Sequence, residues 1–170
     1  MQSSQPSLSL SPLYDQDYYL WLKQTVDCLE NQDLEALDWP HLIEEIKDLG
    51  KNQRRELKNR LIVLLTHLLK WQYQPEQREY YGNSWVSTIN EQRRQLALLL
   101  EDSPSLKPYI VEMFSGSYSK ARKEASQETG LPIETFPVDC PFCQEETLDG
   151  DYWPESLSLD FNPRLRVKTR

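Results

Sequence analysis

The cysteines of the stretch DCPFC, Cys140 and Cys143, have the spacing of half a zinc site or of a redox pair. A structural zinc needs four ligands, and the chain adds only His41 and His67. If one helix carries both histidines, they lie roughly 39 Å apart and cannot bind the same ion. A redox motif of this spacing normally follows a strand, whereas helical periodicity dominates this chain. We therefore expect Cys140 to pack as a small apolar residue and Cys143 to be an incidental free thiol that could oxidise.

A second candidate is a polar cluster of His67, Gln92 and Arg93, which fall on or beside the apolar faces of two predicted helices. If these helices form an antiparallel pair, the three side chains lie at about the same level. Arg93 needs a carboxylate partner there or must extend to water. His67 is either a general base, a ligand, or a core-edge side chain with one hydrogen bond. The cluster therefore either fixes the register of two helices or forms a site.

Glu44, Glu45 and Asp48 form an acidic patch, in which Glu44 and Asp48 are one helical turn apart. Carboxylate oxygens suit a hard cation. Acidic side chains are also favoured near a helix N-terminus, so we interpret the patch as a solvated helix end. The DGD stretch at 149–151 lacks the remaining spacing of a calcium loop. We assign no catalytic residue, no metal ligand and no cofactor.

Four helices must position these residues. The first begins near Asp15 or Asp17, either of which can act as an N-cap. The second is one long central helix in which Gly50 could introduce a bend. Gly130 is well placed as the left-handed residue that follows the fourth. The predicted helices cover residues 15–30, 38–71, 84–101 and 103–129, and residues 72–83 are a predicted loop.

Apolar residues recur at helical spacing on these helices and are expected to form the core. The stripe of the first helix is Tyr18, Leu22, Val26 and Leu29, and that of the second is Leu42, Ile46, Leu49, Leu57, Leu61, Leu64 and Leu68. In the fourth stripe, the small residues Ser117 and Ala121 would let a neighbouring helix approach closely.

The segment 131–155 carries four prolines and scattered aromatic residues, and we interpret it as an extended strap with one short helix near 141–148. The predicted fold is all-α: a mostly antiparallel four-helix bundle with one long central helix and this C-terminal strap. Residues 13–155 are predicted to form a single helical domain. Residues 1–12 are predicted to be a disordered lead-in, and residues 156–170 a flexible basic tail.

The order of several stretches resembles a bacterial family, the domain-of-unknown-function family numbered twenty-nine. These stretches are YDQDYYLWL, LIEEIKDLGKNQRREL, LLTHLLKWQYQP, SWVSTINEQR, SPSLKPYI, ETGLP and CPFCQEETLDGDYWPE. The resemblance implies an all-helical fold and carries no catalytic residue over to this chain. At the cysteine pair, Cys140 matches the family pattern and Cys143 departs from it, which argues against a family-wide thiol pair or metal site.

Charge and composition limit the function further. A net charge of −8 over 170 residues, with a pI near 4.8, disfavours nucleic acid and anionic membranes as partners. The sequence contains no apolar run long enough to span a membrane, and the odd cysteine count favours a reducing cytoplasm. We expect a protein-interaction or regulatory module whose partner is another protein, with association of identical chains left open. The alternatives are a metal-assisted hydrolase around Glu44 or His67, and a nucleic-acid-associated regulator using Arg54, Arg55, Lys58 and Arg60.

Overall fold

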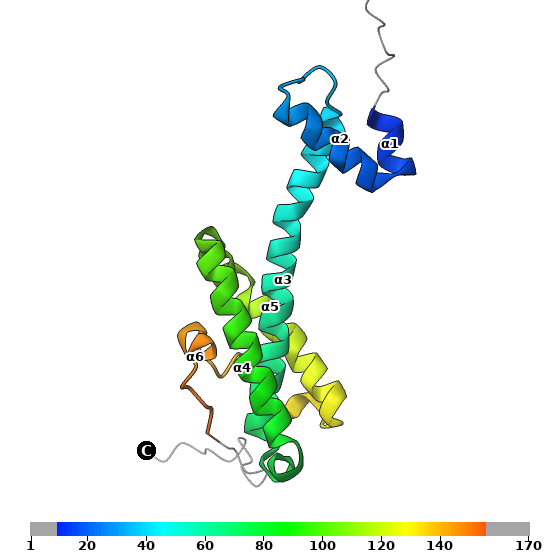
Figure 1. Ribbon diagram of the computed structural model, residues 1–170. Coiled ribbons are helices and arrows are strands. Elements are labelled where there is room, and N and C mark those ends of the chain that lie inside the picture. The colour runs from blue at the N-terminus through cyan, green and yellow to red at the C-terminus, as the bar shows by residue number, and fades with distance from the viewer. Residues whose placement is uncertain (1–9, 156–170) are drawn as a thin grey trace, which may run out of the picture. The chain divides into compact units, whose positions relative to one another are not determined.

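The computed structural model describes residues 10–155, which contain helices and no strand. The prediction of an all-α fold is therefore confirmed. The elements in chain order are α1 (Leu10–Gln16), α2 (Tyr18–Glu30), α3 (Trp39–Tyr73), η1 (Pro75–Gln77), α4 (Arg78–Asp102), η2 (Pro104–Leu106), α5 (Lys107–Thr129), η3 (Ile133–Thr135) and α6 (Gln144–Leu148) (Figure 1). None of the described helices is both long enough and apolar enough to cross a membrane.

The chain divides into an N-terminal unit, residues 1–53, and a C-terminal unit, residues 54–170. In the N-terminal unit, the side chain of Asp17 accepts a hydrogen bond from the backbone N–H of Leu20 at 3.0 Å, so Asp17 is the predicted N-cap of α2. Helix α1 was not predicted, since the lead-in was expected to extend to residue 12. A proline in the first turn, here Pro12, does not prevent a helix from forming.

Helix α3 is the predicted long central helix and contains 35 residues. It continues through Gly50, where an added Cβ would meet no atom within 4 Å. Its burial changes along its length: residues 49–56 are all exposed, whereas most residues from Leu57 to Leu69 are buried. The predicted core stripe is therefore core only from Leu57 onward.

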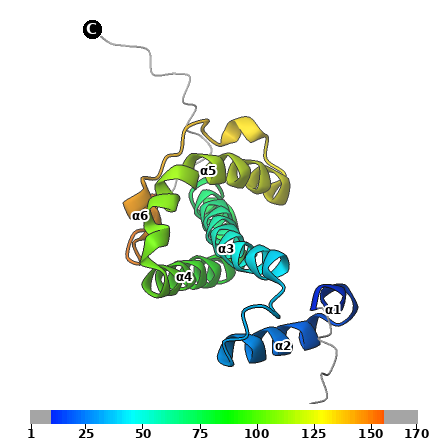
Figure 2. The same ribbon diagram turned by 90° about the horizontal axis from the view of Figure 1, so that it is seen from above.

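The C-terminal unit has its hydrophobic core between the second half of α3 and the helices α4 and α5, which lie on two sides of it (Figure 2). Ser117 and Ala121 of α5 are fully buried. The hydroxyl of Thr66 on α3 lies 3.5 Å from the backbone oxygen of Ala121. This contact between a side chain of α3 and the backbone of α5 agrees with the expected close approach of a neighbouring helix.

Helix α4 begins at Arg78, earlier than the predicted start near Ser84, so most of the predicted loop is helical. Gly82, interpreted as part of a loop, instead packs against α3: a Cβ there would lie 3.9 Å from the ring of Trp71. Arg78 stabilises the same corner, because its guanidinium lies 4.1 Å from the Trp71 ring centroid and its Nε donates to the Trp71 carbonyl at 3.0 Å.

The strap follows α5 and contains the short helix α6 at residues 144–148. Gly130 has φ of +70° and ends α5 as predicted. The four-helix bundle stays a prediction, because α2 belongs to the N-terminal unit and α4 and α5 to the C-terminal unit. The single domain over 13–155 also stays a prediction. Residues 1–9 of the predicted lead-in, and the basic tail at 156–170, lie outside the described residues.

Candidate functional site

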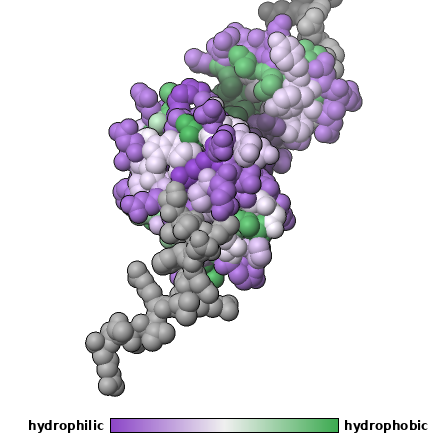
Figure 3. Space-filling model, turned by 90° about the horizontal axis from the view of Figure 1, so that it is seen from below, coloured by the Kyte–Doolittle hydropathy of each residue, from purple (hydrophilic) through white to green (hydrophobic). Residues whose placement is uncertain are grey.

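The N-terminal unit exposes most of the apolar side chains that were expected to be core. We use the name N-terminal apolar face for eight exposed apolar residues of this unit: Tyr18, Leu22, Val26 and Leu29 on α2, and Trp39, Ile43, Ile46 and Leu49 on α3. The α2 residues are the predicted core stripe, and they are 37–48 % exposed; on α3, Ile46 is 60 % and Leu49 65 % exposed. The prediction that these stripes are core is therefore wrong for this unit. In the space-filling view, hydrophobic patches interrupt a largely hydrophilic surface (Figure 3).

A cluster of rings, which includes Tyr18 of this face, joins α1 and α2 to the start of α3. The Tyr14 ring stacks on His41 at 4.0 Å and contacts the buried Trp21 edge-on at 5.0 Å. The hydroxyls of Tyr14 and Tyr18 both donate to Glu45, at 2.6 and 2.7 Å. The hydrogen bond to this carboxylate raises the pKa of Tyr14 to about 12. Tyr18 therefore belongs both to this cluster and to the apolar face.

The predicted acidic patch is divided among separate contacts. Glu45 accepts the two tyrosine hydroxyls, and Asp48 pairs with Lys51 at 2.6 Å. Asp38, just before the start of α3, accepts a hydrogen bond from Nδ1 of His41 at 2.6 Å. In the part of the chain that the structure describes, no three His, Cys, Asp or Glu side chains gather closely enough to hold a metal ion.

The three members of the predicted polar cluster each have different partners. Nδ1 of His67 bonds to the Val63 carbonyl at 2.9 Å, and burial lowers the pKa of His67. The side-chain oxygen of Gln92 accepts a weak hydrogen bond from Arg60 at 3.5 Å. Arg93 points to the strap. His67 and Arg93 therefore each bond to backbone carbonyl groups, and a site formed by the three residues stays a prediction.

Arg93 is 5 % exposed, and its side chain binds backbone carbonyl groups of the strap. Its Nε donates to the Thr147 carbonyl at 3.0 Å, and its Nη2 donates to the carbonyls of Tyr152 at 2.9 Å and Glu146 at 3.3 Å. A longer contact of 3.4 Å joins Nη1 to the Gly150 carbonyl. The expectation that this arginine needs a carboxylate or water is therefore wrong. Four backbone carbonyl oxygens, which are the negative ends of peptide dipoles, accept from the guanidinium instead.

The two cysteines of the strap differ in their surroundings. Cys143 is the N-cap of α6: its sulfur accepts from the Glu146 N–H at 3.4 Å, while the Glu146 carboxylate accepts from the Cys143 N–H at 3.1 Å. The interpretation of Cys143 as incidental is therefore wrong, and the predicted start of the short helix near Pro141 is too early. Cys140 is half-buried, and burial raises its pKa to about 11.

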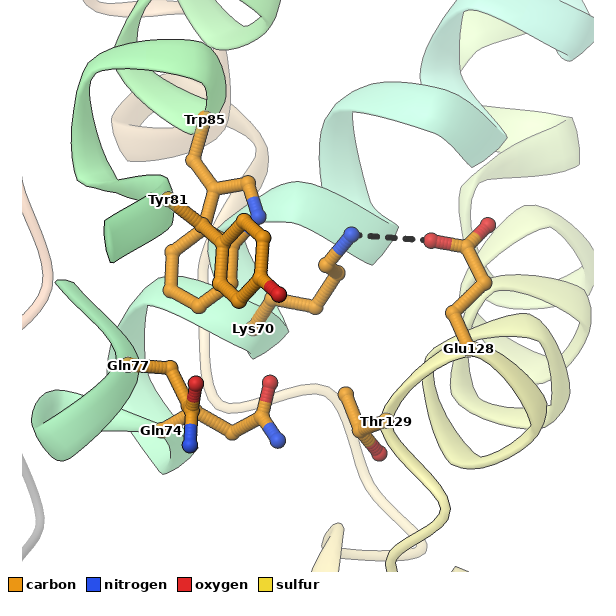
Figure 4. A pocket seen from close by; sticks show the side chains of 7 residues that line it. All are labelled: Lys70, Gln74, Gln77, Tyr81, Trp85, Glu128 and Thr129. Carbon is orange, nitrogen blue, oxygen red and sulfur yellow. Dashed lines mark hydrogen bonds and ion pairs between the residues drawn. The ribbon is translucent and has the colours of Figure 1, made fainter.

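A pocket of about 460 Å³ lies within the C-terminal unit, between the end of α3, the start of α4 and the end of α5 (Figure 4). Lys70 and Glu128 face each other across it, with Nζ and Oε2 2.9 Å apart. The rings of Tyr81 and Trp85 stack at 6.1 Å, and the Lys70 Nζ lies 5.4 Å from the Trp85 ring centroid (Figure 4). Because Lys70 and Glu128 neutralise each other, the pocket gives no reason to expect a charged ligand. No sequence signal connects these two residues, which are 58 positions apart.

The basic stretch of α3 is partly used within the C-terminal unit. The Arg54 guanidinium lies 4.1 Å from the Tyr109 ring centroid, and Arg60 pairs with Glu56 at 2.7 Å. These contacts occupy two of the four basic residues considered for nucleic-acid binding.

Comparison with known proteins identifies the family of the chain. Neither the curated proteins nor the solved structures contain a significant match to this sequence. One family model matches residues 13–153, which cover both the N-terminal apolar face and the Arg93–strap contact. The resemblance seen in the sequence is therefore confirmed, and the chain belongs to the family described as Domain of unknown function DUF29.

Proposed function

We propose that the protein is an interaction module that docks another protein through the N-terminal apolar face. The observation that supports this proposal is an imbalance within the N-terminal unit. Of its described large apolar side chains, only Trp21 and Leu37 are buried, whereas eleven are exposed, out of sixteen exposed in the described chain as a whole. A folded surface rarely leaves so much apolar area in water unless a partner covers it.

The spacing of the exposed residues also supports docking. On α2 they recur at intervals of four, four and three residues, and on α3 at four, three and three, so each helix carries one apolar stripe. Fully burying one aliphatic side chain of this size contributes about 1.5–3 kcal/mol. The eight residues of the face are about half exposed, so covering all of them contributes on the order of 6–12 kcal/mol, which is comparable with the roughly 4–15 kcal/mol that association costs.

The alternative functions have less support. A metal-assisted hydrolase around Glu44 or His67 would need several metal ligands close together, and among the described residues no three His, Cys, Asp or Glu side chains gather in this way. A nucleic-acid regulator would use the basic stretch of α3, where Arg54 and Arg60 are engaged. Within the interaction proposal, we keep a cytoplasmic location as a prediction, because it rests on the cysteine count alone.

Affinity purification from the cell that produces the protein tests the proposal with paired variants. The double change Ile46→Ser and Leu49→Ser removes the most exposed part of the face on α3. The control is Val111→Ser with Val138→Ser, which removes two equally exposed apolar side chains of the C-terminal unit. We expect the wild type and the control to retain the same partner protein, and the face variant to lose it.

The fold should tolerate these changes, because substitutions at exposed positions usually alter stability by less than about 0.5 kcal/mol. Circular dichroism of each purified variant checks this point. If the face variant retained the partner as well as the wild type does, the proposal would be wrong. Near-stoichiometric metal in the purified protein, measured by elemental analysis, would instead favour the hydrolase.

A further inference from the structure

Almost all the net charge of the chain lies in the N-terminal unit. Residues 1–53 contain ten acidic and three basic side chains, a net charge of −7, whereas residues 54–170 contain 17 acidic and 16 basic side chains, a net charge of −1. The unit with the exposed apolar residues is therefore also the strongly acidic one. Its Glu30 is exposed next to Leu29 of the apolar face, whereas the exposed Asp27 and Glu44 lie on the sides of α2 and α3 that point away from the apolar stripes, at about 100° per residue.

We infer that the occupant of the N-terminal apolar face is a basic amphipathic helix of another protein. This inference rests on the proposed function and names the chemistry of the partner. The apolar stripes of α2 and α3 supply the contact area, and the net charge of −7 in the same unit, with Glu30 beside Leu29 of the face, favours lysine and arginine on the incoming helix. Opposite charges at the rim of an interface increase the association rate and select the partner.

The helical form of the partner follows from the two stripes. Two helices that each expose an apolar stripe can be covered by a third helix whose own apolar residues recur at i, i+3, i+4 and i+7. The backbone N–H and C=O groups of a helical partner are satisfied by hydrogen bonds within that helix. The partner therefore needs no backbone donors or acceptors from the face.

The charge also argues against a second copy of this unit as the occupant. Face-to-face pairing of two N-terminal units would bring two net charges of −7 together, and like charges at an interface oppose association.

Synthetic helical peptides test the inference on the full chain. Three peptides of about 18 residues, roughly five helical turns, carry the same leucine stripe. All their remaining positions are lysine in the first peptide, glutamine in the second and glutamate in the third. A fourth has the lysine composition with its leucines scattered around the helix. Binding is followed by fluorescence anisotropy. We expect the lysine peptide to bind at least about tenfold more tightly than the glutamate peptide, with the glutamine peptide between them, and the difference to shrink as salt rises. The scattered peptide should bind at least about tenfold more weakly than the lysine peptide.

Paired variants separate the apolar and the electrostatic contributions. Ile46→Ser with Leu49→Ser should weaken all three striped peptides by about tenfold or more. Glu30→Gln with Glu44→Gln should weaken only the lysine peptide, by at least about threefold.

The matched control is the pair Glu101→Gln and Asp102→Asn in the C-terminal unit, which removes the same charge from an exposed helix end. This control should leave the binding of every peptide unchanged. Loss of lysine-peptide binding in the control would mean that the overall charge, and not the face, attracts the peptide, and the inference would fail.

The outcomes distinguish the inference from the proposed function. Equal binding of the three striped peptides, lost in Ile46→Ser with Leu49→Ser, would overturn the basic partner and leave the docking face intact. No binding above that of the scattered peptide would overturn both. A wild type that sediments as a dimer, and becomes monomeric in the Ile46→Ser with Leu49→Ser variant, would show that a second copy occupies the face, which overturns the inference.

A competing candidate for the N-terminal apolar face is the basic tail of the chain itself. Its four basic residues, Arg164, Arg166, Lys168 and Arg170, are changed together to glutamine. We expect the lysine peptide to bind this variant and the wild type equally. A gain in affinity of more than about tenfold would mean that the tail competes for the same face, and the inference of a separate partner protein would be wrong.

Discussion

Removing the guanidinium of Arg93 should release the strap from α4. Its two shortest hydrogen bonds, to Thr147 at 3.0 Å and Tyr152 at 2.9 Å, join a charged donor to neutral carbonyls. Bonds of this type contribute about 1.5–3 kcal/mol each. The two longer contacts, to Glu146 and Gly150, add less. Arg93→Met keeps a flexible apolar stem and leaves these carbonyls without their donor, so we expect a loss of about 3 kcal/mol.

Urea unfolding followed by circular dichroism gives the total loss, and amide hydrogen exchange of residues 144–152 locates it. A loss of about 3 kcal/mol corresponds to a decrease of roughly 100-fold in the protection of the strap amides if they exchange by local opening. Arg93→Lys should fall between the wild type and Arg93→Met, because an ammonium group cannot reproduce the planar fork. The matched control is Arg94→Met, which removes an exposed arginine paired with Glu91 and should leave the strap protected.

The reasoning would be refuted if Arg93→Met changed stability by less than about 1 kcal/mol and left the strap amides protected. Water molecules would then satisfy the four carbonyls as well as the guanidinium does. Equal losses in Arg93→Met and Arg94→Met would also contradict it, because the effect would then come from charge and not from the buried contacts.

Three further predictions concern single residues. Because the folded protein lowers the pKa of His67, the unfolded chain binds a proton at this histidine before the folded chain does as pH falls below about 6.5. The wild type should therefore lose more stability between pH 7 and 5 than His67→Gln does, measured by urea unfolding at each pH. Parallel curves of stability against pH for the two proteins would contradict this. Cys143 should react with a thiol reagent in the native protein, whereas Cys140 should react only after unfolding, as mass spectrometry of the labelled peptides would show. Gly50→Ala should stabilise the chain by about 0.5–1 kcal/mol, and Gly130→Ala should destabilise it by about 1 kcal/mol, because only Gly130 has a positive φ; the same sign for both changes would be inconsistent with this reasoning.

The elements of the fold that local chemistry determines could be predicted from the sequence. Asp17 caps α2 by a contact three residues away, and Gly130 ends α5 through its own backbone conformation. The long α3 follows from uninterrupted helix formers, since a single glycine in the middle costs only about 1 kcal/mol. Each of these signals lies within a few residues of its effect.

What could not be predicted depends on contacts between distant residues. Helical spacing identifies Leu22 and Val26 as an apolar stripe, but it cannot say whether this chain or another protein covers that stripe. Gly82 looks like a loop residue until the Trp71 ring beside it is known. The partners of Arg93 are backbone carbonyls 53–59 residues away, and no residue type marks such an acceptor.

The use of main-chain acceptors by Arg93 has a consequence for how the family can vary. Every amino acid carries a carbonyl group, so the side chains at positions 146, 150 and 152 can change while the hydrogen bonds to Arg93 persist. In an alignment of relatives, we expect an arginine column that varies little and has no co-varying partner in the strap. Methods that infer contacts from correlated substitutions would therefore miss this link between α4 and the strap, although it is one of the most buried polar contacts of the described chain.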